Sequence, residues 1–186
     1  MDVFTAIHSR HSIPKVKPDP LPREVIEKLL SAAVQAPNHY KVRPWHFVVL
    51  TGKGRERLGE VMVASFKSKF PELPAEALEK ERQKPLRAPL LIAVAAEKPS
   101  EPRVNEIENI CAASAACQNI LLAANGLGLG AIWRTGDAAR DPKIKEFLGF
   151  APDQHLIGFL YIGYPENTDA VPAERPSFED RTVWME

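Results

Sequence analysis

Three neighbouring polar residues, Arg10, His11 and Ser12, lie where the first predicted helix ends, and their types suit the binding of an anion. A guanidinium group and a hydroxyl both donate hydrogen bonds to phosphate oxygens, and the planar guanidinium can contact two oxygens at once. Serine and charged residues are also common as solvated caps at helix ends. The triplet alone therefore leaves two interpretations open, an anion site and a plain helix end.

A second group of polar residues lies in a predicted loop between a helix and a strand. The stretch APNHYKVRPWHF, residues 36–47, places Asn38, His39 and Arg43 ahead of a Pro-Trp pair. Loops that join buried elements often carry binding residues, because the rigid scaffold positions them while the loop itself stays exposed. Taken alone, the stretch also fits a plain surface loop.

A glycine-rich passage, GLGLG at residues 126–130, has the composition of a dinucleotide-binding loop but stands in the wrong context. Such a loop needs a strand before the glycines and a helix after them, whereas here a predicted helix precedes and a predicted strand follows. The glycines instead predict a helix end and a tight turn. They would also let the next segment, AIWRTG, approach a planar ligand, with Arg134 directed at a negative group. Trp133 is expected in the core or in a pocket wall.

The remaining reactive side chains predict neither a metal site nor a nucleophile. His8 and His11 are close in sequence, but no third Asp, Glu, Cys or His lies at ligand spacing beside them. The sequence contains no serine or cysteine nucleophile motif, no phosphate-loop lysine and no paired-carboxylate motif. Cys111 and Cys117 fit core packing better than metal binding. If the chain is an enzyme, we expect a cofactor to supply its chemistry.

The length and charge of the chain limit the function classes. At 186 residues it fits one domain, residues 1–186, which is large enough to bury a core. Lys plus Arg and Asp plus Glu each number 24, so no net charge favours binding to nucleic acid or to an anionic membrane. We find no continuous apolar run of the roughly 18 residues that a membrane span needs, and no basic leader, which predicts a cytoplasmic protein.

The apolar periodicity predicts the elements that must position these groups. Helices are predicted over residues 2–8, 22–37, 55–70 and 105–125, within the charged segment 71–89, and after Asp141. Buried strands are predicted over residues 46–52, 90–97 and 155–165, with one more after the glycines. The helix over 105–125 is apolar nearly all round, which predicts a central position. Without a repeating strand-helix-strand pattern, the order favours an α+β fold, followed by an extended arm over residues 165–186.

Taken together, these stretches resemble the nitroreductase family of FMN-dependent oxidoreductases. Residues 10–12 match the family's R-x-S, APNHYKVRPWHFVVL resembles its A-P-S-x-x-N-x-Q-P-W-x-F pattern, and AANGLGLGAIWRTG carries a W-R-[ST]. Order and spacing agree from residue 1 to about 165, and the small-protein branch of the family is the best match. The resemblance implies a nitroreductase-like fold, with a mixed, mainly antiparallel sheet around a long buried central helix. It also implies a homodimer that the C-terminal arm helps to hold together.

The resemblance further implies that FMN binds at the interface between two subunits. One subunit would hold the phosphate and ribityl groups, with Arg134 adding a second positive charge to the dianionic phosphate. The residues expected from this subunit are Arg10, His11, Ser12, Trp133, Arg134 and Thr135. The partner subunit would contribute residues near the flavin ring, namely Gln35, Pro37, Asn38 and His39. No side chain is expected to be catalytic, because the flavin N5 carries the hydride.

The implied activity is hydride transfer from NADH or NADPH through flavin N5 to a nitroaromatic, a quinone or another electron-poor acceptor. The charged segment 71–89 is a candidate mobile cover for the pocket. Three departures from the family pattern bear on FMN affinity: Pro14, followed by Lys15, replaces a basic residue, Gln35 stands in place of an arginine, and Arg43 replaces a glutamine. The missing basic residue at Pro14 keeps open the alternative of an FMN-binding or storage protein with little turnover. A dimeric scaffold without cofactor is a third interpretation.

Overall fold

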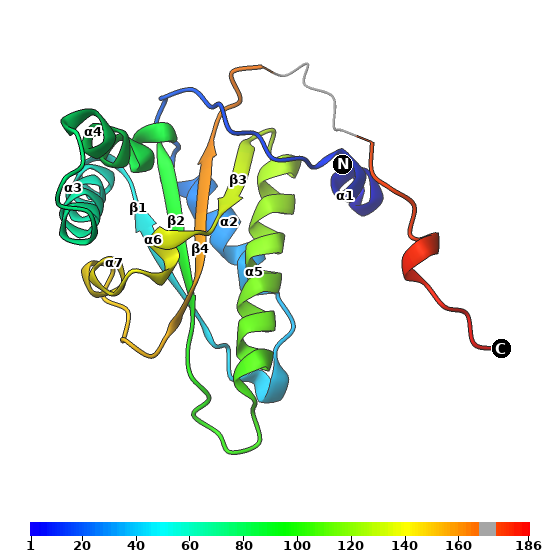
Figure 1. Ribbon diagram of the computed structural model, residues 1–186. Helices are drawn as coiled ribbons and strands as arrows, with labels where there is room; N and C mark the ends of the chain where they lie inside the picture. The colour runs from blue at the N-terminus through cyan, green and yellow to red at the C-terminus, as the bar shows by residue number, and fades with distance from the viewer. Residues whose placement is uncertain (168–173) are drawn as a thin grey trace.

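The computed structural model describes residues 1–167 and 174–186, and Figure 1 shows its helices and strands. The predicted α+β class is confirmed. Residues 168–173 of the predicted arm lie outside the described residues. The elements in chain order are α1 (Val3–Ser9), α2 (Arg23–Ala33), η1 (His39–Lys41), β1 (Trp45–Leu50), α3 (Gly52–Lys69), α4 (Ala75–Gln83), η2 (Lys84–Arg87), β2 (Leu90–Ala96), α5 (Glu106–Gly126), β3 (Gly130–Arg134), α6 (Asp137–Arg140), α7 (Pro142–Phe147), β4 (His155–Gly163) and η3 (Glu179–Arg181).

The four strands form one sheet in the order β1-β2-β4-β3. All three pairings between the described strands are antiparallel, so this part of the chain lacks the parallel pair that the predicted mixed sheet would contain. β1 is an edge strand in which His46 and Val49 are exposed, and the prediction that it is fully buried is wrong. Its β-branched and aromatic residues indicated a strand, but they carry no information about its place in the sheet.

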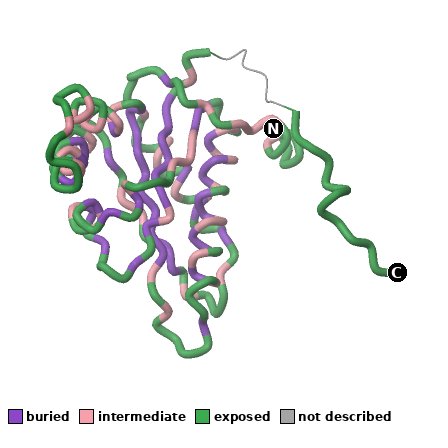
Figure 2. The backbone as a smooth tube through the Cα atoms, viewed as in Figure 1, coloured by how far each residue is buried: buried purple, intermediate pink, exposed green. Residues whose placement is uncertain are grey.

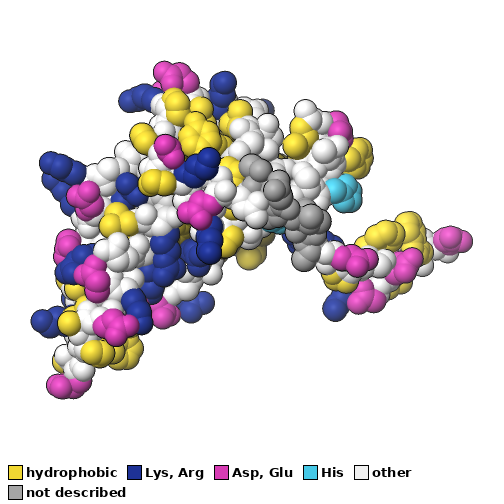
Figure 3. Space-filling model, turned by 90° about the horizontal axis from the view of Figure 1, so that it is seen from above, with side chains coloured by type: hydrophobic (Ala, Val, Ile, Leu, Met, Phe, Trp, Pro, Cys, Tyr) yellow, Lys and Arg dark blue, Asp and Glu magenta, His cyan; other side chains and the backbone are white. Residues whose placement is uncertain are grey.

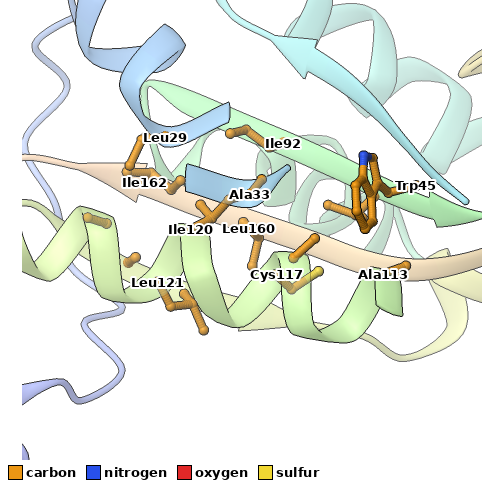
Figure 4. Close-up of a cluster of buried hydrophobic side chains, with 14 of the residues drawn as sticks. Leu29, Ala33, Trp45, Ile92, Ala113, Cys117, Ile120, Leu121, Leu160 and Ile162 are labelled. Atoms are coloured by element: carbon orange, nitrogen blue, oxygen red, sulfur yellow. The ribbon is translucent and has the colours of Figure 1, made fainter. Parts of the chain in front are cut away.

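Helices cover both faces of the sheet (Figure 1). α2 and α5 pack on one face, where Leu29, Ile120 and Leu160 belong to one buried cluster, and Figure 4 shows these side chains meeting. α3 and α7 pack on the other face, where Leu58 and Ile144 belong to a second cluster. Because both faces are covered, all seven residues of β2 are buried, and its sequence LLIAVAA is apolar without alternation.

Helix α5 is 21 residues long and begins with a capping box between Asn105 and Glu108. Figure 2 shows that the side of α5 toward the sheet is buried, whereas its outer side is partly exposed. Cys117 lies on the buried side, and burial raises the pKa of its thiol to about 12. Cys111 is exposed on the outer side, so its predicted place in the core is wrong. The two cysteines are six positions apart, so the helical repeat directs them to different faces.

By length and composition, α5 could also cross a membrane, although no single apolar run in the sequence had indicated this. Core helices pass the same test, and the buried side of α5 packs against the sheet. We therefore interpret α5 as the core helix of this fold.

The predicted helix end and tight turn at the glycines are confirmed. Gly128 adopts a left-handed φ of 71°, which ends α5 and leads into β3. The space beside Gly130 is filled by the chain's own Ile13 and Val16, whose side chains would meet an added Cβ at 2.9 and 3.0 Å. The close approach that was predicted for a planar ligand is made here by the N-terminal segment.

Helix α4 lies against α3 at a glycine. A Cβ added to Gly59 would lie 2.5 Å from the carbonyl oxygen of Arg82, closer than Cβ atoms approach in proteins. The Arg82 side chain pairs with Glu60 at 2.8 Å beside this contact. The segment 71–89 therefore rests on α3, and its movement as a cover stays a prediction.

We expect Gly59→Ala to lower the free energy of unfolding by about 1–3 kcal/mol, because the new methyl group would force α3 and α4 apart. Gly54→Ala in the same helix is the matched control. There the new Cβ would meet Leu50 at 3.4 Å, an ordinary contact, and higher helix propensity should add up to about 1 kcal/mol. Urea unfolding followed by circular dichroism measures both changes. Equal stability of the two variants would contradict the tight packing of α4 on α3.

Candidate functional site

A cavity of about 480 Å³ lies on the α3 side of the sheet, between α3, η2 and the segment that follows β3. This volume is within the usual range for small-molecule sites. Met62 and Phe66 of α3, Phe159 and Tyr161 of β4 and the predicted residues 133–135 line it. Aromatic walls and a few polar groups suit a planar ligand.

Two of the three acidic groups that line this cavity, Asp141 and Glu81, are already paired, and the third, Asp137, is exposed at the start of α6. Lys69 and Ser65 both donate hydrogen bonds to Asp141, and Lys84 pairs with Glu81. Burial raises the pKa of Asp141, but the hydrogen bonds from Lys69, Ser65 and two backbone N–H groups outweigh burial, and the net pKa is lowered. Asp141 therefore stays charged at neutral pH and caps α7, as predicted.

Arg134 carries positive charge in the cavity that the paired acids do not neutralise. Its guanidinium lies over the Tyr161 ring, 5.6 Å from the centroid, and its Nε is buried without a hydrogen-bond partner. Burial raises the pKa of the Tyr161 hydroxyl, and the nearby Arg134 charge opposes this shift. A buried donor without a partner is costly, so this atom indicates where a ligand acceptor would bind.

The two neighbours of Arg134 have different surroundings. The Trp133 indole packs against the α5 side of the sheet, and its Nε1 donates to the Ile157 carbonyl at 3.4 Å. It lies directly over Gly158, where an added Cβ would come within 2.5 Å of the indole nitrogen. Thr135 is exposed at the cavity. The Trp133 indole thus packs against the core on the α5 side, which is one of the two predicted roles, and the residue also borders the cavity.

The N-terminal triplet is fixed beside the C-terminal end of α5. Asn125 donates to Ser9 Oγ at 2.8 Å, and the Ile13 N–H donates to the Ala131 carbonyl at 3.0 Å. Between these anchors, His11 Nε2 is buried without a hydrogen-bond partner, while Ser12 is exposed. Arg10, His11 and Ser12 are not among the residues that line the 480 Å³ cavity.

Arg10 has a second arginine as its electrostatic neighbour. Burial lowers the pKa of Arg10, and the like charge of Arg175, in the C-terminal arm, lowers it further. Two positive side chains that approach each other are stabilised by an anion between them. Arg175 was not predicted as a site residue, because nothing in the aperiodic arm sequence distinguishes it from other surface arginines.

The loop with the other predicted residues is strained. α2 ends at Ala33, before Pro37, which was expected to end it, because i to i−3 hydrogen bonds already turn the chain at Gln35 and Ala36. Tyr40, Lys41 and Arg43 have left-handed φ values of 49°, 57° and 51°. Such conformations cost about 1–3 kcal/mol each and cluster at functional sites.

Side-chain contacts hold this loop in place. The Asn38 side chain accepts a hydrogen bond from the Arg43 N–H at 2.8 Å. His39 lies 3.6 Å from Glu108, in the first turn of α5. Gln35 and Pro37 are exposed.

The length of α5 separates the two predicted groups. His39 lies at Glu108 near one end of the helix, and Ser9 lies at Asn125 near the other end. These two α5 positions are 17 residues apart, so at a rise of about 1.5 Å per residue they are about 25 Å apart. A single chain therefore does not bring His39 to residues 10–12.

Comparison with known proteins gives a consistent result. The model of the nitroreductase family matches residues 7–164. YdjA of Escherichia coli (strain K12), provisionally named an NAD(P)H nitroreductase, is 33% identical over 89% of this chain and 90% of its own. A Methanothermobacter thermautotrophicus protein, provisionally named an NADH dehydrogenase/NAD(P)H nitroreductase, is 35% identical over 100% of this chain and 87% of its own.

Solved structures share the fold. A nitroreductase-like family protein from Bacillus cereus has a TM-score of 0.85 and 25% identity, covering 100% of this chain and 97% of its own. A nitroreductase from Desulfovibrio desulfuricans in complex with FMN has a TM-score of 0.78 and 21% identity, covering 100% and 98%. The predicted nitroreductase-like fold is confirmed, and the chain belongs to the nitroreductase family.

Proposed function

We propose that this protein is an FMN-dependent oxidoreductase that takes hydride from NADH or NADPH. The observation that carries the proposal is the set of cationic and buried polar groups without counterparts. Arg134 Nε is a buried donor without a partner, and Arg10 lies beside the like charge of Arg175. His11 Nε2 is also buried without a partner, and because His11 Nδ1 donates to the Ser9 carbonyl at 3.1 Å, Nε2 of the neutral ring is an acceptor. An anionic cofactor that also carries hydroxyl donors, such as FMN, would satisfy all of them.

The phosphate of FMN would bind between Arg10 and Arg175, with the exposed Ser12 hydroxyl as a further donor. Two guanidinium groups match the charge of a phosphate dianion and would relieve their own repulsion by binding it. Arg134 lies among aromatic side chains, so we propose that it contacts the ring of the cofactor instead of the phosphate. Positive charge held there would stabilise negative charge that develops on the ring during reduction.

The site would be completed by a second copy of the chain. His39 is too distant to join Arg10 within one chain, and in a homodimer the partner would supply it together with Gln35, Pro37 and Asn38. Exposed apolar side chains support such an interface: in α1, Phe4 is 71% exposed, and in the arm, Trp184 is 78% exposed. Figure 3 shows the hydrophobic side chains of the arm standing apart from the body. Large apolar groups left in water favour association.

When bound, FMN would supply hydride transfer from the nicotinamide to the acceptor. The protein's groups would bind and orient it: Arg10, Ser12 and Arg175 at the phosphate, and Trp133, Arg134 and Thr135 at the cavity. We propose a nitroaromatic, a quinone or another electron-poor molecule as the acceptor. Segment 71–89 lines the cavity through Glu81, Lys84 and Arg87 and would cover the bound ligands. A cytoplasmic location would give access to nicotinamides.

An anaerobic visible spectrum of the purified protein tests the activity. We expect a flavin spectrum that bleaches on addition of NADH or NADPH and recovers when a nitroaromatic or quinone is added. Flavin that is bound but stays oxidised would favour the storage alternative, to which the replacement of a basic residue by Pro14 points. A protein that binds no FMN when it is supplied would refute the proposal.

Replacing Arg175 tests the phosphate site. We expect Arg175→Ala to weaken FMN binding about 10- to 100-fold, because one charge-assisted hydrogen-bonding partner is lost. Riboflavin, which lacks the phosphate, should bind the variant and the parent equally. Arg181→Ala in the same arm is the control, since Arg181 pairs with Asp180 and should not affect either ligand. Flavin fluorescence titration gives the dissociation constants. An equal loss of riboflavin and FMN affinity would place Arg175 outside the phosphate site.

Mixed dimers test whether the site spans two chains. Arg10→Ala homodimers and Gln35→Ala/His39→Ala homodimers should each bind FMN poorly. A heterodimer of the two variants carries one intact site and one doubly defective site, so it should bind about half the FMN of the parent dimer at full affinity. Differently tagged chains, co-expressed and purified through both tags, provide the heterodimer. FMN binding by the heterodimer as poor as in both homodimers would contradict a shared site.

A further inference from the structure

A second cavity, of about 620 Å³, lies at the opposite edge of the sheet from β3. It is enclosed by the proline-rich segment 18–22, helix α2, the end of β1 and the start of α3. Its walls are mainly apolar, formed by proline rings and by the side chains of Leu21, Ile26, Leu30 and Val49. None of the residues assigned above to FMN lines it.

One end of this cavity carries a positive charge with an incomplete set of partners. Arg55 donates from Nη1 to the Ala88 carbonyl at 2.6 Å, while its Nε is buried without a hydrogen-bond partner. Burial lowers the pKa of Arg55, which agrees with a guanidinium that is partly removed from water. The other two charged groups of the lining, Arg23 and Glu27, are exposed and neutralise each other at 2.8 Å.

The start of α3 adds to this positive end. The N-cap residue Thr51 lines the cavity, and its side chain makes no capping hydrogen bond. The first backbone N–H groups of an 18-residue helix carry partial positive charge, and an acceptor near them is favourable. Thr51 and Arg55 are about one helical turn apart, so Arg55 and the helix start lie close together at the cavity.

We propose that this cavity binds an aliphatic monocarboxylic acid. The carboxylate would accept from the Nε edge of Arg55, whose planar geometry matches two carboxylate oxygens. The hydrocarbon chain would lie against Leu21, Leu30 and Val49 and leave water. A single available guanidinium balances one negative charge, so a monocarboxylate fits better than a phosphate dianion. The volume is within the range of small-molecule sites.

The first test compares three probes on the FMN-loaded, full-length protein. Octanoate has both the charge and the chain, 1-octanol has only the chain, and acetate has only the charge. We expect octanoate to bind at least about tenfold more tightly than either, with shifts of the backbone amide signals of Lys53, Gly54 and Arg55 in ¹⁵N NMR spectra. The proposal would be overturned if octanoate bound no more tightly than 1-octanol, or if the shifts were confined to other residues. It would also be overturned if inorganic phosphate competed for the site as effectively as octanoate.

Two variants locate the site. Arg55→Gln should abolish the advantage of octanoate over octanol, whereas the control Arg57→Gln, at an exposed position of the same helix, should keep it. Because Arg55 also bonds the Ala88 carbonyl, its replacement could unfold the chain, and circular dichroism checks this. Val49→Phe tests the site without changing Arg55. Val49 is 39% exposed and lines the cavity, so the larger phenyl ring should block the binding of both octanoate and octanol. Undiminished octanoate binding by Val49→Phe would refute the site.

Discussion

The fixed length of α5 is the constraint on which the arrangement of the site depends. An α-helix rises by a set amount per residue, and its backbone hydrogen bonds prevent it from shortening. α5 is anchored to the sheet along its buried side, to the loop 38–43 at its first turn and to the N-terminal segment at its last. The two sets of polar residues are thereby kept apart. If both sets bind one cofactor, as proposed above, a second molecule of this chain must supply one of them.

The acidic and the basic residues near the proposed site differ in how far they are paired. Two of the three acidic residues that line the main cavity are paired with lysines, and one of these, Asp141, also caps α7. The arginines are not balanced to the same degree: Arg134 rests on an aromatic ring, and Arg10 and Arg175 repel each other. A chain with no net charge can therefore present locally positive sites. The zero net charge argued against binding to nucleic acid, but it says nothing about a cavity for one small anion.

The sequence predicted much of this structure, and its failures have physical causes. Periodicity identified β2 and α5, and the Asp-Pro pair identified the start of α7, because these signals are local. The edge position of β1 and the exposure of Cys111 were missed, since both depend on which elements pack as neighbours. The family motifs predicted the candidate FMN residues within 10–12, 35–39 and 133–135, but no motif predicted Arg175. Arg175 lies near Arg10 because of where the fold places the C-terminal arm, and the arm sequence has no periodic pattern from which this could be predicted.

The three left-handed residues in the loop 38–43 have a consequence for the evolution of this protein. Glycine at Tyr40, Lys41 or Arg43 would adopt the same backbone without strain, so selection for thermal stability alone should favour it there. In the proposed dimer this loop presents Asn38 and His39 to the partner chain, and glycine at these three positions would loosen it. Laboratory selection for heat tolerance should therefore enrich glycine at these three positions, whereas selection for turnover should retain the present side chains. The residues found in the loop after selection would show which property had been selected.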